Sequence, residues 1–101
     1  MIVVRFKVHC QPDKAEDVRA VLENVVAPSR AVDGVISFDI GRDVSDTNAF
    51  IATEVFDDGA ALDRQESLAE VASAMSVLET SLVGPPEATI YNISGVEPYG
   101  E

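Results

Sequence analysis

The sequence contains no tryptophan, only one cysteine and one histidine, and no apolar run long enough to cross a bilayer. A single cysteine, Cys10, cannot form a disulfide within the chain, and no secretory signal is recognisable at the N-terminus. We therefore expect a cytoplasmic protein. The lone histidine, His9, has no partners at metal-ligand spacing, so the sequence predicts no metal site.

Basic residues are also scarce, because seven Lys and Arg residues stand against 18 Asp and Glu residues, for a formal net charge of −11 at pH 7. Such a charge repels the phosphates of nucleic acid and the surface of an anionic membrane, so neither is an expected partner. Two interpretations of the acidity stay open. One is an acidic surface that keeps the protein in solution, and the other is a halophile protein from a high-salt cytoplasm.

Hydrophobic periodicity divides the chain into strands and helices. Residues 2–10 alternate between apolar and polar side chains, as a strand with one buried face does. Residues 12–27 carry apolar side chains at helical spacing, and Pro28 is expected to end or kink this helix near Ala27. The remaining segments are strands at 35–41 and 49–56 joined by a polar turn, a short helix at 58–65, a longer helix from 67, and a strand at 87–93.

Polar residues mark where the two later helices begin. Asp57 or Asp58 can cap the short helix by accepting a hydrogen bond from its first free N–H groups. Ser67 and Glu70 have the spacing of a capping box, in which each side chain bonds to the backbone N–H of the other residue. The sequence therefore predicts that the longer helix begins at Ser67.

The order β-α-β-β-α-β predicts an α+β fold, a ferredoxin-like sandwich, over residues 1–94, with a polar tail at 95–101. In this topology the first and third strands are antiparallel neighbours at the centre of the sheet. Both helical segments then cover one face of the sheet, and the other face is left open.

Alternation along the strands assigns side chains to these two faces. The residues expected under the helices are Ile2, Val4, Phe6, Val8, Ile36, Phe38, Ile40, Ile51, Thr53 and Val55. Those expected on the helix-free face are Val3, Arg5, Lys7, His9, Val35, Ser37, Asp39, Phe50, Ala52, Glu54 and Phe56. The second set is too apolar to be left to water and too charged to be a core. It predicts a homodimer contact centred on Arg5, Phe50, Glu54 and Phe56.

Glu54 is the carboxylate with the most informative surroundings, and two interpretations apply to it. It could be a base with a raised pKa, or it could form an ion pair with Arg5 or Lys7 across the central strands, which is the interpretation we prefer. His9 and Cys10 are adjacent on an alternating strand and point to opposite faces. They are therefore not predicted to form a nucleophile–base pair.

Two stretches resemble the antibiotic biosynthesis monooxygenase (ABM) family. Asp33-Gly34-Val35-Ile36-Ser37-Phe38-Asp39-Ile40-Gly41-Arg42-Asp43 is similar to its glycine turn, aromatic strand and Arg-Asp turn. The second stretch, Phe50-Ile51-Ala52-Thr53-Glu54-Val55-Phe56-Asp57-Asp58, is similar to its Glu-Val-aromatic strand followed by acids. The resemblance implies a quinol monooxygenase-like dimeric α+β barrel, also called a dimeric α/β barrel, in which the sheets of two subunits pack face to face. It also implies a pocket between each sheet and its own helices. It also implies oxidation of small aromatic or quinol-like compounds by O₂ with no cofactor, neither metal nor flavin.

The family positions that often carry histidine hold other residues here. Gln65 stands where relatives carry a histidine at the end of the short helix, and Glu70 stands at a second such position. Glutamine can form a hydrogen bond to a substrate oxygen but cannot exchange a proton near neutral pH. Catalysis is therefore expected to rest on the shape and hydrogen bonding of the pocket. The residues predicted to bind the substrate are Phe38, Thr53, Gln65, Met75 and Tyr91, while no catalytic residue is assigned.

Two functions follow from these observations. The first is a cofactor-independent monooxygenase acting on small aromatic or quinol-like substrates. The second is a non-catalytic dimeric module of the same fold that binds a small molecule. Consumption of O₂ with a panel of quinols distinguishes the two.

Overall fold

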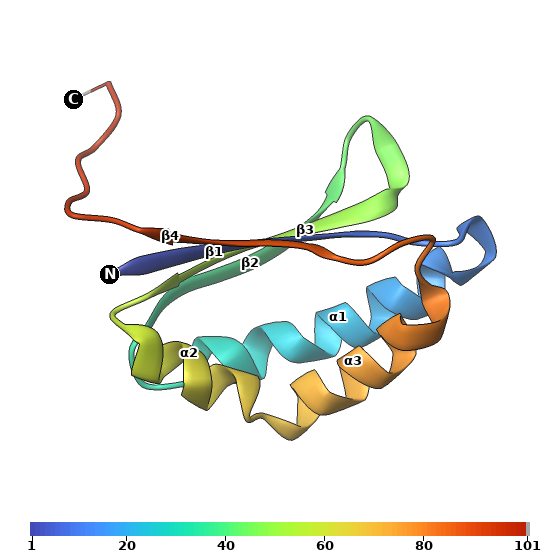
Figure 1. The fold of residues 1–101 in the computed structure, drawn as a ribbon, viewed down its shortest axis with the longest axis horizontal. Coiled ribbons are helices and arrows are strands. Elements are labelled where there is room, and N and C mark those ends of the chain that lie inside the picture. The colour runs from blue at the N-terminus through green and yellow to red at the C-terminus, as the bar shows by residue number, and fades with distance from the viewer. Residues whose placement is uncertain (101) are drawn as a thin grey trace.

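The computed structural model describes residues 1–100 and has four strands, three α-helices and one short 3₁₀ helix (Figure 1). In chain order the elements are β1 (Ile2–His9), η1 (Pro12–Lys14), α1 (Ala15–Arg30), β2 (Val35–Asp43), β3 (Asp46–Phe56), α2 (Gly59–Glu66), α3 (Ala69–Ser81) and β4 (Glu87–Asn92). This order is the predicted β-α-β-β-α-β arrangement, with the second helical region split in two. None of the helices in the described part of the chain is both long and apolar enough to cross a membrane.

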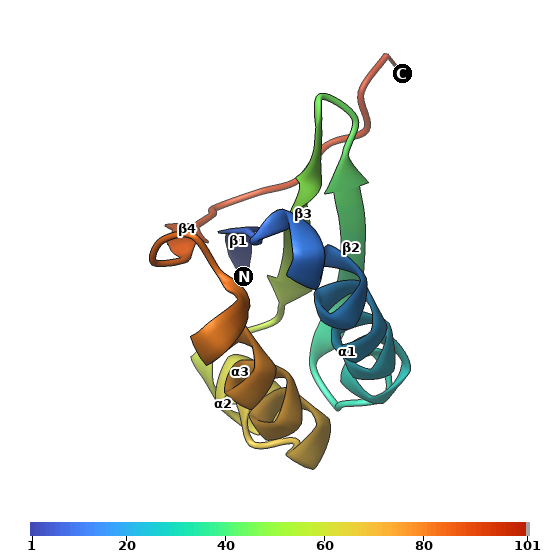
Figure 2. The same cartoon turned by 90° about the vertical axis from the view of Figure 1, so that its right-hand side faces the viewer.

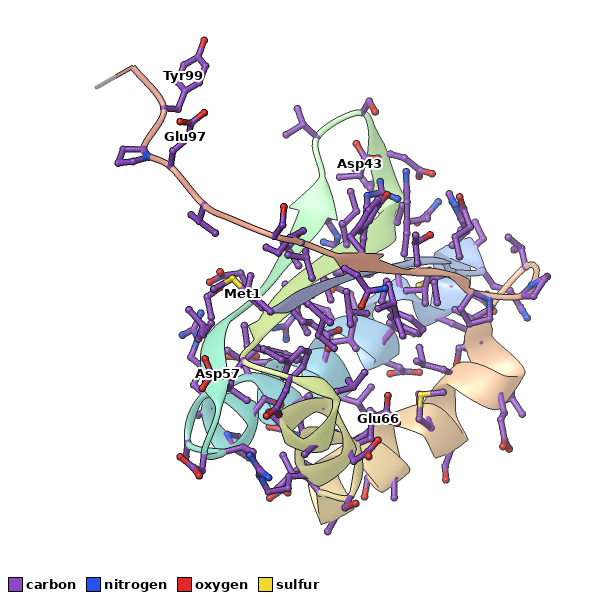
Figure 3. The ribbon with its side chains drawn as sticks, turned by 60° about the vertical axis from the view of Figure 1, so that its left-hand side comes forward. Met1, Asp43, Asp57, Glu66, Glu97 and Tyr99 are labelled. Atoms are coloured by element: carbon purple, nitrogen blue, oxygen red, sulfur yellow. The ribbon has the colours of Figure 1, made fainter. Side chains whose placement is uncertain are left out.

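The strands form one antiparallel sheet in the order β2-β3-β1-β4, so β1 and β3 lie at its centre. All three α-helices lie on the same side of this sheet, with α1 under the β2 side and α3 under the β4 side (Figure 2). The predicted ferredoxin-like fold is therefore confirmed. The chain beyond β4 leads away from the sheet, and Figure 3 shows Glu97 and Tyr99 on this extension.

The starts of the two later helices agree with the sequence in one case and differ in the other. Asp58 Oδ1 accepts a hydrogen bond from the N–H of Ala61 at 3.0 Å, which confirms the cap predicted for the short helix. The predicted capping box is wrong, because Ser67 Oγ donates to the carbonyl of Asp63 at 2.8 Å and so completes the end of α2. The longer helix begins at Ala69, after the extended residue Leu68.

Proline is accommodated within α1. The 3₁₀ turn Pro12–Lys14 leads into the helix as expected, but α1 continues past Ala27 to Arg30 with Pro28 inside it. Pro28 lies in the last turn, where its missing N–H removes only one helical hydrogen bond. The turn then closes through bonds from Ala31 N to the Pro28 carbonyl and from Val32 N to the Ser29 carbonyl, at 3.2 and 3.1 Å.

The sequence analysis assigned the side chains of β3 to the wrong faces of the sheet. Val8 is paired with Phe50, Val4 with Glu54 and Ile2 with Phe56, and paired residues of neighbouring strands share a face. The set Phe50, Ala52, Glu54 and Phe56 is therefore buried under the helices, and Ile51, Thr53 and Val55 lie on the helix-free face. The assignment of Phe50, Glu54 and Phe56 to a dimer contact is overturned for the same reason.

A bulge in β2 changes the predicted faces at the start of that strand. The register between β2 and β3 shifts between Val35 and Ser37, so two residues of β2 occupy the space of one. Val35 consequently packs under the helices against the hydrophobic core, whereas Ile36, which was predicted to be there, is 50% exposed. Phe38 lies under the helices as predicted and is almost fully buried.

Candidate functional site

A cavity of about 440 Å³ lies between the sheet and the helices. It exists because α3 packs chiefly against α1 and has few contacts with the strands above it. Its walls are almost entirely apolar, and they come from all four strands and all three α-helices. The lining residues are Val4, Phe6, Val8, Leu22, Val25, Phe38, Ile40, Phe50, Ala52, Glu54, Leu62, Gln65, Glu66, Val71, Ala74, Met75, Leu78, Ala88 and Ile90.

The three polar lining residues gather at one end of the cavity. Glu54 is opposite Val4 on the central strands, and Gln65 and Glu66 are the last two residues of α2. The other end is apolar and is closed by Val8 and Phe50, which pair with each other. Because each residue of a strand advances it by roughly 3.3 Å, the cavity extends about 13 Å along β1 from Val4 to Val8. Such a space suits a flat apolar molecule with a polar group at one end.

Glu54 is the buried carboxyl of the cavity. Its exposed fraction is 8%, and its direct neighbours across the sheet are Val4 in β1 and Phe38 in β2. Among residues 1–100 the structure gives its carboxylate no hydrogen bond and no ion pair. The predicted ion pair with Arg5 or Lys7 is therefore wrong, because the side chains of these two basic residues lie on the opposite face of the sheet.

The surroundings of Glu54 make its proton harder to remove. Burial among apolar side chains, with a smaller contribution from the negative charge of Glu66, raises the pKa of Glu54 from 4.5 to about 7. Glu66 lies where α2 ends, on the helix side of the sheet (Figure 3). A carboxyl group with such a pKa can both accept and return a proton at neutral pH, as a general base must.

Gln65 is held in place from two sides. Its Nε2 donates a hydrogen bond of 3.0 Å to Oγ of Ser29 in α1, and both side chains are buried. The helix that carries Gln65 is fixed to the loop before β2, because the Arg64 guanidinium donates two hydrogen bonds, of 2.8 and 3.2 Å, to the Asp33 carbonyl. Asp57 N also donates to the Gly34 carbonyl at 2.9 Å.

The predicted substrate-binding residues are divided between the two faces of the sheet. Phe38, Gln65 and Met75 line the cavity, and Met75 is 44% exposed at its rim. Thr53 and Tyr91 alternate with lining residues of β3 and β4, so their side chains lie on the helix-free face, away from the cavity. Binding by the three lining residues stays a prediction, while the placement of Thr53 and Tyr91 in the pocket is wrong.

The sequence analysis left open that Glu54 is a base with a raised pKa, but it assigned Glu54 to the helix-free face, and it did not consider Ser29. The two phenylalanines at positions 50 and 56 were a usable signal for Glu54. Both phenylalanines lie on the same face of β3 as Glu54. Their large aromatic side chains supply more apolar area to a core than Ile51, Thr53 and Val55 on the other face. Ser29 had no such signal, because only the packing of α1 against α2 brings it to Gln65.

The helix-free face carries its own charged contacts. Lys7 Nζ forms an ion pair of 3.1 Å with Asp43, and His9 Nε2 lies 2.7 Å from Glu87. Figure 3 shows Asp43 at the end of the sheet where the β2–β3 hairpin turns. No group of three or more His, Cys, Asp or Glu residues within residues 1–100 is arranged to hold a metal ion.

Comparisons with known proteins agree with this architecture. A family model described as antibiotic biosynthesis monooxygenase matches residues 1–76. An uncharacterised protein of Synechocystis sp. is 31% identical over 93 residues, which cover 92% of this chain and 63% of that protein. The chain thus spans less than two thirds of this relative's length.

Solved structures share the fold along almost the whole chain. A protein from Pseudomonas aeruginosa is 26% identical with a TM-score of 0.83, over 92% of this chain and 94% of the other. A candidate antibiotic biosynthesis monooxygenase from Deinococcus radiodurans is 21% identical with a TM-score of 0.89, over 100% of both chains.

Proposed function

The chain belongs to the antibiotic biosynthesis monooxygenase family, whose model matches residues 1–76, and we propose that it oxidises small aromatic or quinol-like molecules with O₂. The single observation that supports this proposal most is the buried Glu54 carboxyl at the polar end of an apolar cavity. It supplies a proton acceptor in a cavity where Gln65, the residue at a family histidine position, cannot act as one. The proposal includes no metal or flavin.

In the proposed reaction, Glu54 removes a proton from a hydroxyl group, or from a carbon that a hydroxyl group activates. The negative charge moves from the carboxylate to the substrate, so the total charge inside the cavity stays constant. The electron-rich anion then reduces O₂, and a bond forms between carbon and oxygen. Glu54 returns its proton to the resulting peroxide and then removes the remaining proton from the same carbon, so the electrons of that C–H bond form a carbonyl group as the O–O bond breaks. One oxygen atom stays on the product in this carbonyl group. The other departs as hydroxide, takes up the proton that Glu54 has just removed, and leaves as water.

The cavity contributes to this reaction mainly by excluding water. Apolar side chains around the substrate leave its anion poorly solvated and therefore more reactive towards O₂. The rings would lie between Phe38 and Phe6 from the sheet and Met75 from α3. The polar group would face Glu54 and Gln65. This orientation needs no basic residue in the cavity, and none lines it.

The test is O₂ consumption with a panel of hydroxylated aromatics. Glu54→Gln keeps the size of the side chain but removes the proton acceptor, so we expect turnover to fall by about 10²-fold or more. Glu79→Gln is the matched control, because Glu79 is an exposed carboxylate of α3 outside the cavity. If Glu54→Gln turned over substrate as fast as the wild type, Glu54 would not be the base. If the wild type bound aromatics without consuming O₂, the chain would be a binding module.

We also propose that the chain forms a homodimer through its helix-free sheet face. This face carries the half-buried apolar residues Val3, Ile51 and Val55 in its middle, and charged residues such as Arg5 beside them. A mixed surface of this kind is typical of an interface between subunits. The proposal keeps the face predicted from the sequence but replaces three of the four residues assigned to it.

A further inference from the structure

The apolar end of the cavity is closed by a wall that is a single side chain thick. Leu22 of α1, Ile40 of β2 and Phe50 of β3 line the cavity of about 440 Å³, and the same three residues line a groove of about 410 Å³ between α1 and β2. The ring of Phe50 is the largest of these side chains, and the residue is only 5% exposed. Phe50 is therefore the main barrier between the cavity and the groove.

The Phe50 ring is held in place by neighbours on both sides of β3. The guanidinium carbon of Arg42, which is paired with Phe50 in β2, lies 4.7 Å from the centre of the ring. Arg42 Nη2 donates a hydrogen bond of 3.3 Å to Glu16 Oε2 in α1. On the other side, Phe50 is paired with Val8 of β1, which is 1% exposed. A ligand that displaced the ring would have to disturb these contacts, so we expect the wall to stay closed when a ligand binds.

The position of Phe50 relative to Glu54 limits the length of a ligand. The two residues lie on the same face of β3, four residues apart, so their Cα atoms are separated by about 13 Å. A molecule of two aromatic rings in line, with its hydroxyl group beside Glu54, would reach the Phe50 ring. A third ring in the same line would have to occupy the space of the Phe50 side chain. A rigid molecule of this kind cannot bend out past Met75 and Ile90 at the exposed rim of the cavity.

We propose that Phe50 determines how long a ligand of this cavity can be, and that the cavity takes hydroxylated aromatics with no more than two rings in line. The inference deepens the proposed function, because it rests on the same site and specifies its substrate class. Since open space already lies behind the ring, a smaller side chain at this position would extend the cavity into the groove rather than leave an enclosed void.

The test is a fluorescence titration, without O₂, with two rigid phenols: 4-phenylphenol, with two rings in line, and 4-hydroxy-p-terphenyl, with three. The wild type should bind the two-ring phenol at least about ten-fold more tightly, because the wall keeps the longer molecule from burying its additional apolar area. In Phe50→Ala the third ring can enter the groove. Its affinity for the three-ring phenol should therefore rise by about ten-fold or more over the wild type, whereas its affinity for the two-ring phenol should change by about three-fold at most.

Three further variants show where the additional room lies. Val25→Ala is the matched control, because Val25 is a buried residue that lines the cavity but not the groove, and this variant should keep the wild-type ratio of affinities. Ala27 of α1 lines the groove only. When Ala27→Leu is combined with Phe50→Ala, the added side chain fills the groove, so the gain for the three-ring phenol should be lost. Phe50→Leu alone removes less of the core and should show a smaller gain of the same kind.

Several results would overturn the inference. They are equal affinity of the wild type for both phenols, binding of neither phenol, no gain for the three-ring phenol in Phe50→Ala and Phe50→Leu, and a gain that persists when the groove is filled. If the affinities changed as expected but no phenol were oxidised in air, the inference would stand and only the proposed oxygenase activity would fall. If the wild type oxidised 4-phenylphenol but the smaller side chains at position 50 admitted no longer ligand, the activity would stand and the inference would fall.

Discussion

The surroundings of Glu54 and Asp43 shift the pKa values of these two carboxyl groups in opposite directions. The pKa of Asp43 is lowered from 3.8 to about 2, because its carboxylate accepts hydrogen bonds from the backbone and side chain of Ser45 and then from Lys7. Glu54 receives no such donors, and burial raises its pKa to about 7. The first group is held as an anion at the hairpin turn, and the second is suited to exchanging protons.

The raised pKa of Glu54 predicts that it destabilises the folded chain at alkaline pH. The ordinary pKa of this carboxyl is 4.5, and its pKa in the fold is about 7, so the folded chain binds the proton more tightly between these values. The protonated form of Glu54 is compatible with the fold, so the full free energy of unfolding is present below pH 4.5. As the pH rises through 7 the buried group ionises, and the free energy of unfolding falls by about 3 kcal/mol at most. Chemical unfolding at a series of pH values should show this loss in the wild type.

Glu54→Gln should remove the same pH dependence. The variant should therefore be more stable than the wild type above pH 7, by about 2–3 kcal/mol, and similar to it in acid. Glu79→Gln, at an exposed position, should follow the wild type. Parallel curves for the wild type and Glu54→Gln would show that Glu54 keeps an ordinary pKa.

Gln65→Leu should weaken the binding of a hydroxylated aromatic. The substitution removes the amide as a hydrogen-bond partner for the ligand, at a cost of roughly 1–3 kcal/mol of binding free energy. The loss of the bond to Ser29 lowers the stability of the fold instead. Calorimetry with 1-naphthol measures the loss, and Met75→Leu gives the effect of an apolar change in the same wall. Unchanged affinity in Gln65→Leu would remove this residue from the binding site.

At the scale of elements, one glycine decides how closely the loop before β2 approaches α2. Gly34 has φ +87°, in the left-handed region, and a Cβ there would lie 2.7 Å from Ala61 Cβ and 3.0 Å from Arg64 Nη2. Gly34→Ala should therefore destabilise the fold by about 2 kcal/mol or more, from strain and from crowding of α2. Thermal unfolding is the measurement.

Gly59→Ala is the control for that change. Gly59 begins α2, and a Cβ at this position would meet no atom within 4 Å, so alanine should be neutral or stabilising by up to about 1 kcal/mol. Equal melting temperatures for the two variants would contradict the role assigned to Gly34.

The order and type of the elements could be predicted from the sequence, because local patterns determine them. Period-two alternation identified β1, and Asp58 marked the start of α2. The face of β3 could not be predicted in the same way. Both alternating sets of this strand are largely apolar, so alternation alone does not choose between them, and a shift of one residue exchanges the faces. Only the large side chains of Phe50 and Phe56 distinguish the buried set.

The candidate site was predicted only in part for the same physical reason. Phe38 and Gln65 could be placed because one is a large apolar residue of a strand and the other ends a helix whose position the fold determines. Glu54 was assigned to the wrong face together with the rest of its strand. Its neighbour in the cavity, Glu66, and the hydroxyl group of Ser29 depend on how α2 packs, which no local pattern reports.

At the scale of the whole molecule, the proposed dimer can be tested on the apolar middle of the helix-free face. Val55 is half-buried there, directly opposite Val3. Val55→Asp would place a charge inside the interface, so the variant should sediment as a monomer at micromolar concentration, where the wild type should be a dimer. Val44→Asp, at a fully exposed hairpin turn, should leave the dimer intact. A monomeric wild type would contradict the proposal.

The scarce contacts between α3 and the sheet also have a kinetic consequence. One end of α3 is tied to the end of β1, by hydrogen bonds from Gln11 N to the Ser81 carbonyl and from Val83 N to the His9 carbonyl, at 2.8 and 2.9 Å. Its other end follows the short connection at Leu68. We therefore expect α3 to move outward, at the cost of its packing on α1, more easily than the strands separate, so ligands should enter and leave without global unfolding. Amide hydrogen exchange should be faster in α3 than in β1, and a bound ligand should slow it selectively.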